Sequence, residues 1–269
     1  MNETLTTLDA GSLCYECRGN GPDILLVHGF ASSLRVWDPL IAALEADYRC
    51  WAVDLAGCGG SYCAPDQQIT LDEHVDLLLA FVRQRELNLR AVIGHSMGGM
   101  LTLKLALAAP HLAERLVLVC PTVTGKYFWG ANYLVAAPVV QKLLLMTRPL
   151  WDVLQAEAVK PLLMTPHYLT MPVRERIRDD FRRTSWGAAM SAIAGITAEN
   201  LEPRLPEIQQ PTLVIVGEHD DMVPPSEGRL AAHTMPQAVL LEVPRCHHLP
   251  LDEAPEQTLG PIQAFLRGS

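Results

Sequence analysis

One serine lies in a setting where serine chemistry is expected. The hexapeptide GHSMGG, residues 94–99, follows a short apolar run at residues 91–93 and opens a helical pattern. Such a sharp turn from strand to helix strains the serine backbone and lifts its hydroxyl above the sheet edge. Gly94 and Gly98 leave room for the neighbouring elements, and the helix N-terminus favours negative charge. A bare G-x-S-x-G match is common, but this context predicts that Ser96 is a nucleophile.

Apolar runs and helical patterns alternate on both sides of this serine. The runs that we interpret as strands are residues 4–8, 12–17, 24–27, 50–53, 91–93, 116–120, 212–216 and 239–243. Helical patterns cover residues 34–46, 71–85, 97–109, 186–197, 227–234 and 255–266. Ser33 is a candidate N-cap for the first helix, and Thr70 with Glu73 forms a capping box for the second. The alternation predicts an α/β fold with a mostly parallel, eight-stranded sheet and helices on both faces.

The alternation breaks between residue 123 and about residue 185. This apolar stretch contains five prolines and is interpreted as several short helices that form a cap over the strand ends. The predicted domains are a core at 1–122 and 198–269, and a cap with its return helix at 123–197. Residues 127–146 are long enough to span a bilayer, but Asn132, Gln141, Lys142 and a central Pro138 argue against a transmembrane helix. Peripheral contact of the cap with lipid is left open.

Five motifs, each placed after an apolar run, resemble those of the α/β-hydrolase family over essentially the whole chain. They are HGF at 28–30, DLAGCGGS at 54–61, GHSMGG at 94–99, GEHD at 217–220 and HLPLDEAP at 248–255. The resemblance implies a catalytic triad in the chain order Ser, Asp, His, with no cofactor and no metal. Relatives that cleave epoxides or carbon–halogen bonds carry Asp at the nucleophile position, so a serine there argues against both activities.

In the order that the resemblance implies, Ser96 is the nucleophile, Asp220 the acid and His248 the base. The histidine takes the proton of the serine and later protonates the leaving group, while the aspartate fixes the imidazole tautomer. Asp220, rather than Asp221, closes the G-x-x-D turn of the family. His248 lies five residues before the glutamate of the family's E-x-P pattern. His247 occupies the position where the family usually has glycine, and its side chain is expected to point away from the triad.

Two backbone amides are expected to form an oxyanion hole. The residue after the nucleophile, Met97, supplies one N–H group, and Phe30 in the loop after the third strand is the best candidate for the other. His28 is expected to brace that loop by hydrogen bonding. The residues tentatively assigned to the substrate pocket are His28, His95, Trp129 and Trp151.

The predicted reaction is hydrolysis of a carboxylic ester through an acyl-enzyme, with an apolar part of a small to medium substrate beneath the cap. Lactonases, amidases, acyltransferases and hydrolases of C–C bonds in ring-cleavage products use a similar triad and remain alternatives. The last group often has Trp directly after the histidine, where this chain has Leu249, and ranks lower. A weakly catalytic small-molecule receptor, or a binding protein of a pigment or lipid pathway, is the alternative of another class.

The amino-acid composition limits the kinds of partner that we expect. The chain has 269 residues and a net charge of -9, and its densest basic stretch, residues 174–183, is interrupted by acidic residues. That stretch is interpreted as a solvated helix face, so nucleic acid is not an expected partner. The N-terminal residues lack a basic segment followed by an apolar run, and the seven cysteines are irregularly spaced. These features predict free thiols and a cytoplasmic location. The sequence does not indicate an oligomeric state.

Overall fold

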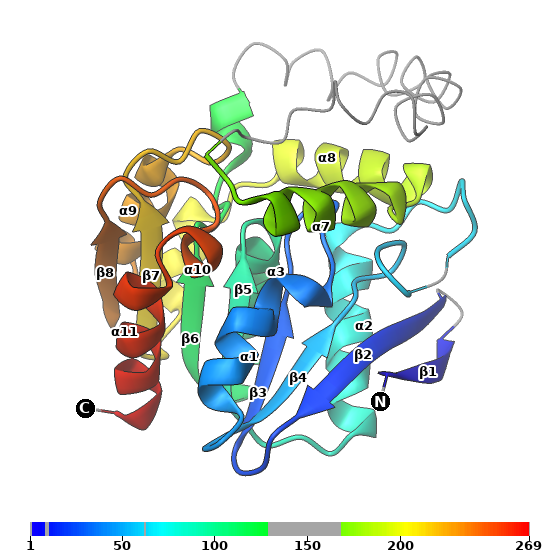
Figure 1. Ribbon diagram of the computed structural model, residues 1–269, viewed down its shortest axis with the longest axis horizontal. Helices are drawn as coiled ribbons and strands as arrows, with labels where there is room; N and C mark the ends of the chain where they lie inside the picture. Colours follow the sequence, from blue (N-terminus) through cyan, green and yellow to red (C-terminus); the bar gives the residue numbers. More distant parts are fainter. Residues whose placement is uncertain (1, 9–10, 62, 129–167, 269) are drawn as a thin grey trace.

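The fold is seen in a computed structural model that describes residues 2–8, 11–61, 63–128 and 168–268 (Figure 1). Eight strands form one sheet in the order β1-β2-β4-β3-β5-β6-β7-β8. They are β1 (Asn2–Leu8), β2 (Gly11–Arg18), β3 (Asp23–Val27), β4 (Arg49–Val53), β5 (Leu89–His95), β6 (Ala113–Val119), β7 (Thr212–Gly217) and β8 (Ala238–Val243). Strand β2 is antiparallel to both β1 and β4, and the remaining pairs are parallel. The predicted fold class is confirmed.

Helices cover both faces of the sheet, as the buried apolar strands require. The α-helices are α1 (Asp38–Leu44), α2 (Leu71–Gln84), α3 (Met97–Ala108), α7 (Met171–Arg182), α8 (Trp186–Ala198), α9 (Pro225–Thr234), α10 (Pro250–Glu253) and α11 (Pro255–Arg267). Short 3₁₀ helices are η1 (Leu34–Trp37), η2 (Gly125–Phe128) and η4 (Glu202–Glu207). The capping box of Thr70 and Glu73 is present at the start of α2.

The alternating direction of strand side chains builds two cores, one on each face. In β3, Leu25 and Val27 join the core formed with α2, α3 and α9. Ile24 and Leu26 join the opposite core, formed with α1 and α11. Because successive residues of a strand point to opposite faces, one short apolar strand serves both cores. The carboxyl ends of the parallel strands are thereby held rigidly along one edge.

The prediction of one continuous helix over residues 34–46 is wrong. Ser33 does accept a hydrogen bond from the amide of Arg35, but it caps the 3₁₀ helix η1. The α-helix α1 begins afterwards, at Asp38, with Pro39 in its first turn. A proline has no N–H group to continue a helical ladder and is favoured in the first turn, so it marks a new start.

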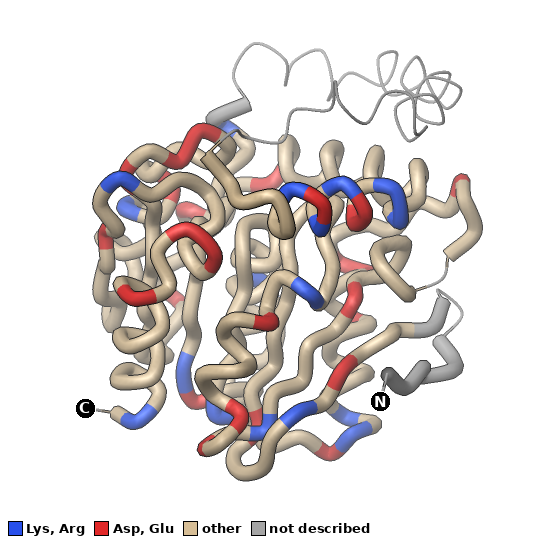
Figure 2. Tube along the Cα trace, viewed as in Figure 1, with Lys and Arg blue, Asp and Glu red and all other residues tan. Residues whose placement is uncertain are grey.

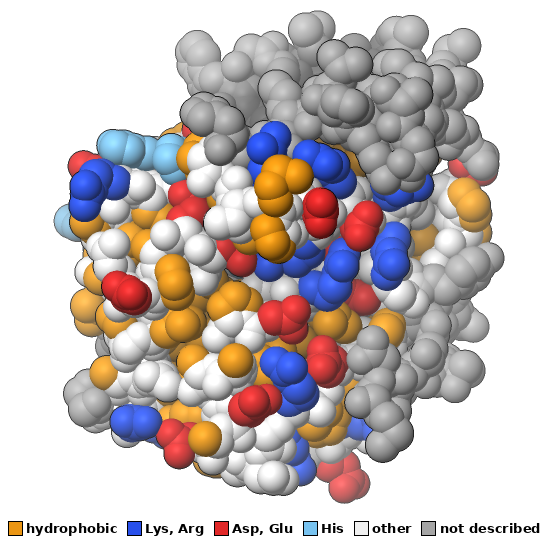
Figure 3. Space-filling model, viewed as in Figure 1, with side chains coloured by type: hydrophobic (Ala, Val, Ile, Leu, Met, Phe, Trp, Pro, Cys, Tyr) orange, Lys and Arg blue, Asp and Glu red, His pale blue; other side chains and the backbone are white. Residues whose placement is uncertain are grey.

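Helices α7 and α8 lie across the carboxyl edge of the sheet (Figure 1). They belong to the segment predicted as a cap, of which the structure describes residues 123–128 and 168–197. Trp129, Trp151 and the prolines at 138, 149, 161 and 166 lie outside the described residues. Basic and acidic residues are interspersed along α7 (Figures 2 and 3). The helix is more than a solvated face, because the guanidinium of Arg176 forms two hydrogen bonds with the well-buried carboxylate of Asp252.

Candidate active site

Ser96 lies at the sharp turn between β5 and α3. Its backbone has φ 56° and ψ -119°, in a region that residues other than glycine seldom adopt. The strain is held by hydrogen bonds from the Ser96 amide to the carbonyl of Val119, 2.9 Å, and from the Thr122 amide to the carbonyl of Ser96, 3.2 Å. These contacts fix the turn to the end of β6. Ser96 is buried, with 8% of the residue exposed.

The two glycines that flank the turn have the steric role expected from the sequence. A Cβ atom at Gly98 would lie 2.1 Å from the carbonyl oxygen of Val27, and one at Gly94 would lie 2.2 Å from that of Gly98. Backbone atoms cannot yield as a flexible side chain can, so only glycine permits strand β3, strand β5 and helix α3 to approach this closely. The close approach places Ser96 beside the loop that follows β3.

Asp220 and His248 are joined directly. The Nδ1–H group of His248 donates to Oδ2 of Asp220 at 2.7 Å, and both side chains are almost completely buried. The other carboxylate oxygen of Asp220 accepts the amides of Met222 and Val223. Burial acts to raise the pKa of Asp220, but the hydrogen bonds and the nearby imidazole outweigh it and hold the pKa below its ordinary value. The carboxylate is therefore ionised and orients the ring of His248.

The neighbours of this pair have other partners. His247 directs its Nδ1 to Oε2 of Glu253, 2.9 Å away, and its ring stacks on Tyr168 at a centroid distance of 3.6 Å. The carboxylate of Asp221 accepts a long hydrogen bond from the hydroxyl of Tyr168. Consecutive residues thus point in different directions, and the structure brings together Asp220 with His248 rather than Asp221 with His247.

The two amides assigned to the oxyanion hole are unpaired. Neither the N–H group of Phe30 nor that of Met97 donates to any residue in the described parts of the chain. Met97 is the first residue of α3, where amides lack an intrahelical acceptor. A Cβ atom at Gly29 would lie 2.9 Å from the Cβ of Ser96, so the loop that carries Phe30 passes close to the serine. The backbone N–H groups of Phe30 and Met97 therefore flank Ser96 and remain available as donors.

His28 braces two loops and does not line a pocket. The residue is 0% exposed. Its Nδ1–H group donates to the carbonyl of Gly29, and its Nε2 accepts the amide of Leu55. Burial is the largest cause that lowers the pKa of His28, which keeps the ring neutral. Both ring nitrogens are occupied, so the bracing role predicted for His28 fits the structure better than the tentative pocket role.

His95 holds the loop of His248 against the turn at Ser96. Its Nε2–H group donates to the backbone carbonyl of His248 at 2.8 Å, and the two ring centroids are 4.7 Å apart. Burial, followed by the proximity of His248, lowers the pKa of His95 to about 3, so the ring is neutral. Its buried Nδ1 has no hydrogen-bond partner among the described residues. We therefore describe His95 as a positioning residue rather than the pocket residue tentatively predicted.

Helices α7 and α8 attach to the loops that carry the site. Asp180 of α7 accepts hydrogen bonds from Ser33 at 2.7 Å and from Arg35 at 2.5 Å, just beyond the loop of Phe30. A small apolar cluster, built on Trp186 and Ala189 of α8, packs against Phe30. This part of the predicted cap is thus tied to the loop that carries Phe30 and presents apolar surface beside it.

Two buried residues near the site escaped the sequence analysis. Glu227 of α9 accepts the amides of Val123 and Thr124, and so anchors the chain where it leaves the sheet after β6. Cys120, directly after β6, has a ligand atom within 4.8 Å of those of Asp220 and His248. The signal for Cys120 was available in principle, because β6 and β7 are adjacent in this fold and the residues that follow them meet at one edge.

Comparison with known proteins agrees with this architecture. The model of the alpha/beta hydrolase fold family matches residues 22–255. A pimeloyl-[acyl-carrier protein] methyl ester esterase of Nitrosomonas europaea is 27% identical over 272 aligned residues, which cover 94% of this chain and 99% of that protein.

Solved structures give the same picture. A hydrolase from Pseudomonas aeruginosa PA01 superposes with a TM-score of 0.81 at 25% identity, covering 100% of this chain and 98% of that one. The enol-lactonase from Burkholderia xenovorans LB400 superposes with a TM-score of 0.74 at 26% identity, covering 96% and 97%.

The chain belongs to the α/β-hydrolase family. It is an enzyme of the hydrolase class, a serine hydrolase that cleaves esters of small molecules. In the described part of the chain, no helix combines the length and the hydropathy needed to cross a bilayer.

Proposed function

We propose that Ser96, His248 and Asp220 form the catalytic triad of this ester hydrolase. The observation that carries the proposal is the 2.7 Å hydrogen bond between His248 and Asp220, held against the strained turn at Ser96 through His95. The tautomer that this bond selects leaves Nε2 of His248 free to accept a proton. A buried, oriented imidazole with that free nitrogen is what a serine nucleophile requires.

The reaction proceeds in two halves. His248 takes the hydroxyl proton while Ser96 attacks the ester carbonyl, and the amides of Phe30 and Met97 stabilise the oxyanion that develops. His248 then donates the proton to the leaving alkoxide, and an acyl-enzyme remains on Ser96. A water molecule activated by the same imidazole hydrolyses it and restores the serine. Asp220 stays ionised throughout and stabilises the imidazolium that forms in each half.

The substrate class that we propose is an ester with an apolar acyl or alcohol part. The apolar cluster of Trp186 and Ala189 beside Phe30 supports this, since the groups nearest the candidate oxyanion loop are hydrocarbon surface. We also propose the division into a core at 1–122 and 198–269 and a cap at 123–197. The passage of α7 and α8 across the carboxyl edge supports that division.

Two particular substrates deserve inclusion in a test. The Nitrosomonas relative is named for the methyl ester of a pimeloyl group on acyl-carrier protein, which makes methyl esters of medium-length acyl chains a first candidate. A lactone is the second candidate, because the enol-lactonase shares the fold over nearly its full length and a lactone is an internal ester open to the same attack.

Replacement of the nucleophile tests the assignment. We expect Ser96→Ala to fold normally and to lower turnover of p-nitrophenyl esters by about three to six orders of magnitude. Ser191→Ala is the matched control, because Ser191 is buried to a similar degree in α8. It should retain most of the turnover. More than about a tenth of wild-type turnover in purified, folded Ser96→Ala protein contradicts the proposal.

A further inference from the structure

A thiol lies next to the pair of Asp220 and His248. Cys120 follows β6, Asp220 follows β7 and His248 follows β8, and these three strands are consecutive in the sheet. One ligand atom from each residue, a sulfur, a carboxylate oxygen and an imidazole nitrogen, lie within 4.8 Å of one another. All three residues are buried, at 2%, 8% and 4% exposure. The cluster is thus built into the rigid edge of the sheet.

The backbone fixes the position of the thiol. Cys120 has φ 46°, and its amide donates to the carbonyl of Ile215 at 2.7 Å. Its Sγ lies 3.9 Å from the carbonyl oxygen of His247. Burial, followed by the charge of Asp220, raises the pKa of Cys120 well above its ordinary value. The resting residue is therefore an uncharged thiol beside the carboxylate, unsuited to act as a nucleophile.

The three donors suit a particular class of cation. Zn²⁺ binds thiolate, imidazole and carboxylate together, at distances of about 2.0–2.3 Å, so its tetrahedral ligands lie about 3.3–3.8 Å apart. The three ligand atoms already lie within 4.8 Å of one another, so a bound ion would draw the sulfur closer and widen the 2.7 Å separation between Nδ1 of His248 and Oδ2 of Asp220. Hard cations such as Mg²⁺ prefer oxygen alone, whereas a sulfur ligand selects zinc and softer metals.

We propose that Cys120, Asp220 and His248 form a binding site for Zn²⁺ or a similar thiophilic divalent cation, whose occupancy switches off ester hydrolysis. The inhibition, though not the binding, rests on the proposed role of His248 as base. No ion needs to contact Ser96 for this effect, since the metal acts on the opposite side of the imidazole ring.

Proton accounting explains the inhibition. In the resting enzyme Nδ1 of His248 carries the proton and faces Asp220, while Nε2 is the free base. The cation takes the sulfur of Cys120, an oxygen of Asp220 and Nδ1. The thiol proton leaves to solvent, and the ring proton moves from Nδ1 to Nε2. One proton is released per ion, and the ring stays neutral. With Nε2 protonated, His248 has no lone pair with which to accept the proton of Ser96.

The test combines inhibition with direct binding on the metal-free full-length chain. Zn²⁺ should inhibit ester hydrolysis saturably, and EDTA should restore the rate. Relative to each variant's own uninhibited rate, Cys120→Ser should raise the half-inhibitory Zn²⁺ concentration on the order of tenfold or more. Cys246→Ser is the matched control, because its buried thiol also contacts the carbonyl of His247, at 3.7 Å, and it should match the wild type.

Binding is read without activity from the ultraviolet cadmium–thiolate band. Cd²⁺ should produce this band in Ser96→Ala protein, and Ser96→Ala combined with Cys120→Ser or Cys120→Ala should lose it, with folding checked by circular dichroism. Equal Zn²⁺ sensitivity of Cys120→Ser and wild type, or a band that survives in folded Cys120 variants, overturns the proposal. A Cys120-dependent band together with an active Ser96→Ala enzyme instead refutes the proposed triad and leaves the metal site standing.

Discussion

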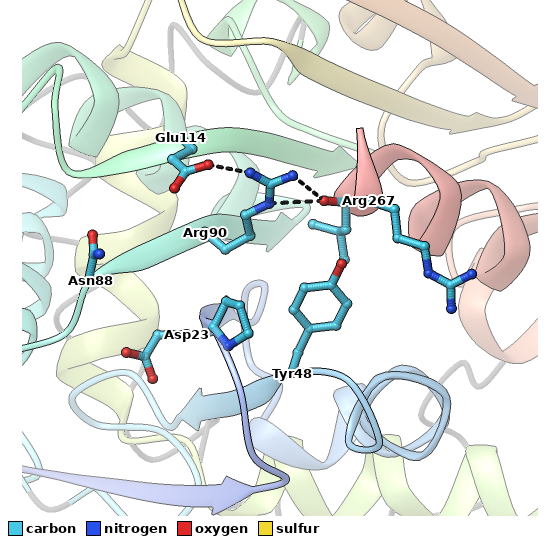
Figure 4. A pocket seen from close by; sticks show the side chains of 8 residues that line it. Asp23, Tyr48, Asn88, Arg90, Glu114 and Arg267 are labelled. Carbon is cyan, nitrogen blue, oxygen red and sulfur yellow. Dashed lines mark hydrogen bonds and ion pairs between the residues drawn. The ribbon is translucent and has the colours of Figure 1, made fainter. Parts of the chain in front are cut away.

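The two edges of the central sheet carry similar kinds of residue, but these residues have different roles at each edge. At the amino edge of the parallel strands, a cleft of about 590 Å³ is lined by Pro22, Asp23, Tyr48, Asn88, Arg90, Glu114, Leu266 and Arg267 (Figure 4). At the carboxyl edge lie Ser96, Asp220, His248 and the amides of Phe30 and Met97. Both edges combine charged groups with apolar walls, and the amino-edge cleft is large enough to accept a small molecule.

The charged groups of the amino edge satisfy one another. Asp23 accepts two hydrogen bonds from Arg49, at 2.6 and 3.0 Å, and one from the indole of Trp51 at 2.7 Å. Arg90 donates twice to the carbonyl of Leu266 and pairs with Glu114. A ligand in this cleft would have to break such pairs in order to bind through them.

The carboxyl edge, in contrast, contains backbone N–H groups that are not yet used in hydrogen bonds among the described residues. Two amides have no acceptor in the described chain, and Ser96 is held in a strained conformation. His95 is buried and neutral, with one nitrogen used to hold His248. Hydrogen-bond donors without an acceptor and backbone strain, rather than the size of a cleft, therefore distinguish a reactive site from a structural one.

The largest loss of kcat should follow substitution of His248 and not of the adjacent His247. We expect His248→Ala to lower kcat by about four to six orders of magnitude, because the base is lost. His247→Gly should retain most activity, since the ring of His247 contacts Glu253 and Tyr168 instead. Steady-state kinetics on a p-nitrophenyl ester measures both. An inactive His247→Gly with an active His248→Ala would reverse the assignment.

Substitution of the proposed acid, Asp220, should have the second largest effect on kcat. Asp220→Asn keeps the shape of the side chain but disturbs the imidazole tautomer, so kcat should fall by about four orders of magnitude. Asp221→Asn is the control and should change kcat far less, because its carboxylate reaches only Tyr168. The opposite ranking of these two variants would move the role to Asp221.

His95 should have a smaller, positional effect. His95→Phe removes the hydrogen bond to the carbonyl of His248 and allows its loop to shift, so kcat should fall about ten- to hundredfold. KM should change little, because His95 is not expected to contact substrate. His74→Phe, which alters a buried histidine on α2, is the control and should leave kcat near the wild-type value. Equal losses in both variants would show that the effect is general destabilisation.

A substitution at the amino edge should change the stability of the fold and leave kcat almost unchanged. Asp23→Asn weakens the pairing with Arg49 and Trp51 and should lower the free energy of unfolding by about 1–3 kcal/mol, while kcat stays within about twofold. Burial acts to raise the pKa of Asp23, but its hydrogen bonds to Arg49 and Trp51 outweigh this effect and hold the pKa below its ordinary value. The stabilisation is therefore present above the unfolded pKa and is lost as pH falls through the folded pKa.

Denaturant unfolding at pH 7 and in mild acid measures this dependence. The stability difference between wild type and Asp23→Asn should shrink as the pH falls below about 4. A large loss of kcat in Asp23→Asn would mean that the two edges are coupled and would break the comparison.

The sequence predicted the scaffold well because the scaffold follows local rules. Buried strands appear as short apolar runs, and the turn at Ser96 needs glycine on both sides. Counting along the family pattern selected His248, which the structure pairs with Asp220. The interruption of the helix after residue 37 was missed, although Pro39 was visible, because the apolar periodicity continues across it.

The remaining errors concern contacts between distant segments. The tentative pocket placement of His28 and His95 does not fit their contacts, because His28 bonds to the amide of Leu55 and His95 to the carbonyl of His248. The bracing role that was also predicted for His28 fits these contacts. The position of Cys120 beside Asp220 depends on the order of β6, β7 and β8 in the sheet. The local sequence pattern does not show which imidazole nitrogen forms a hydrogen bond with a residue distant in the chain.

The central claim is that Ser96 is a nucleophile activated by His248, and a fluorophosphonate probe tests it most directly. Intact mass and peptide mapping should show one adduct per chain, located on Ser96 and absent from Ser96→Ala. His248→Ala should slow the labelling by about a thousandfold or more, whereas His247→Gly should label at nearly the wild-type rate. An active wild-type enzyme that carries the adduct on another residue, or that labels equally fast without His248, would contradict the account.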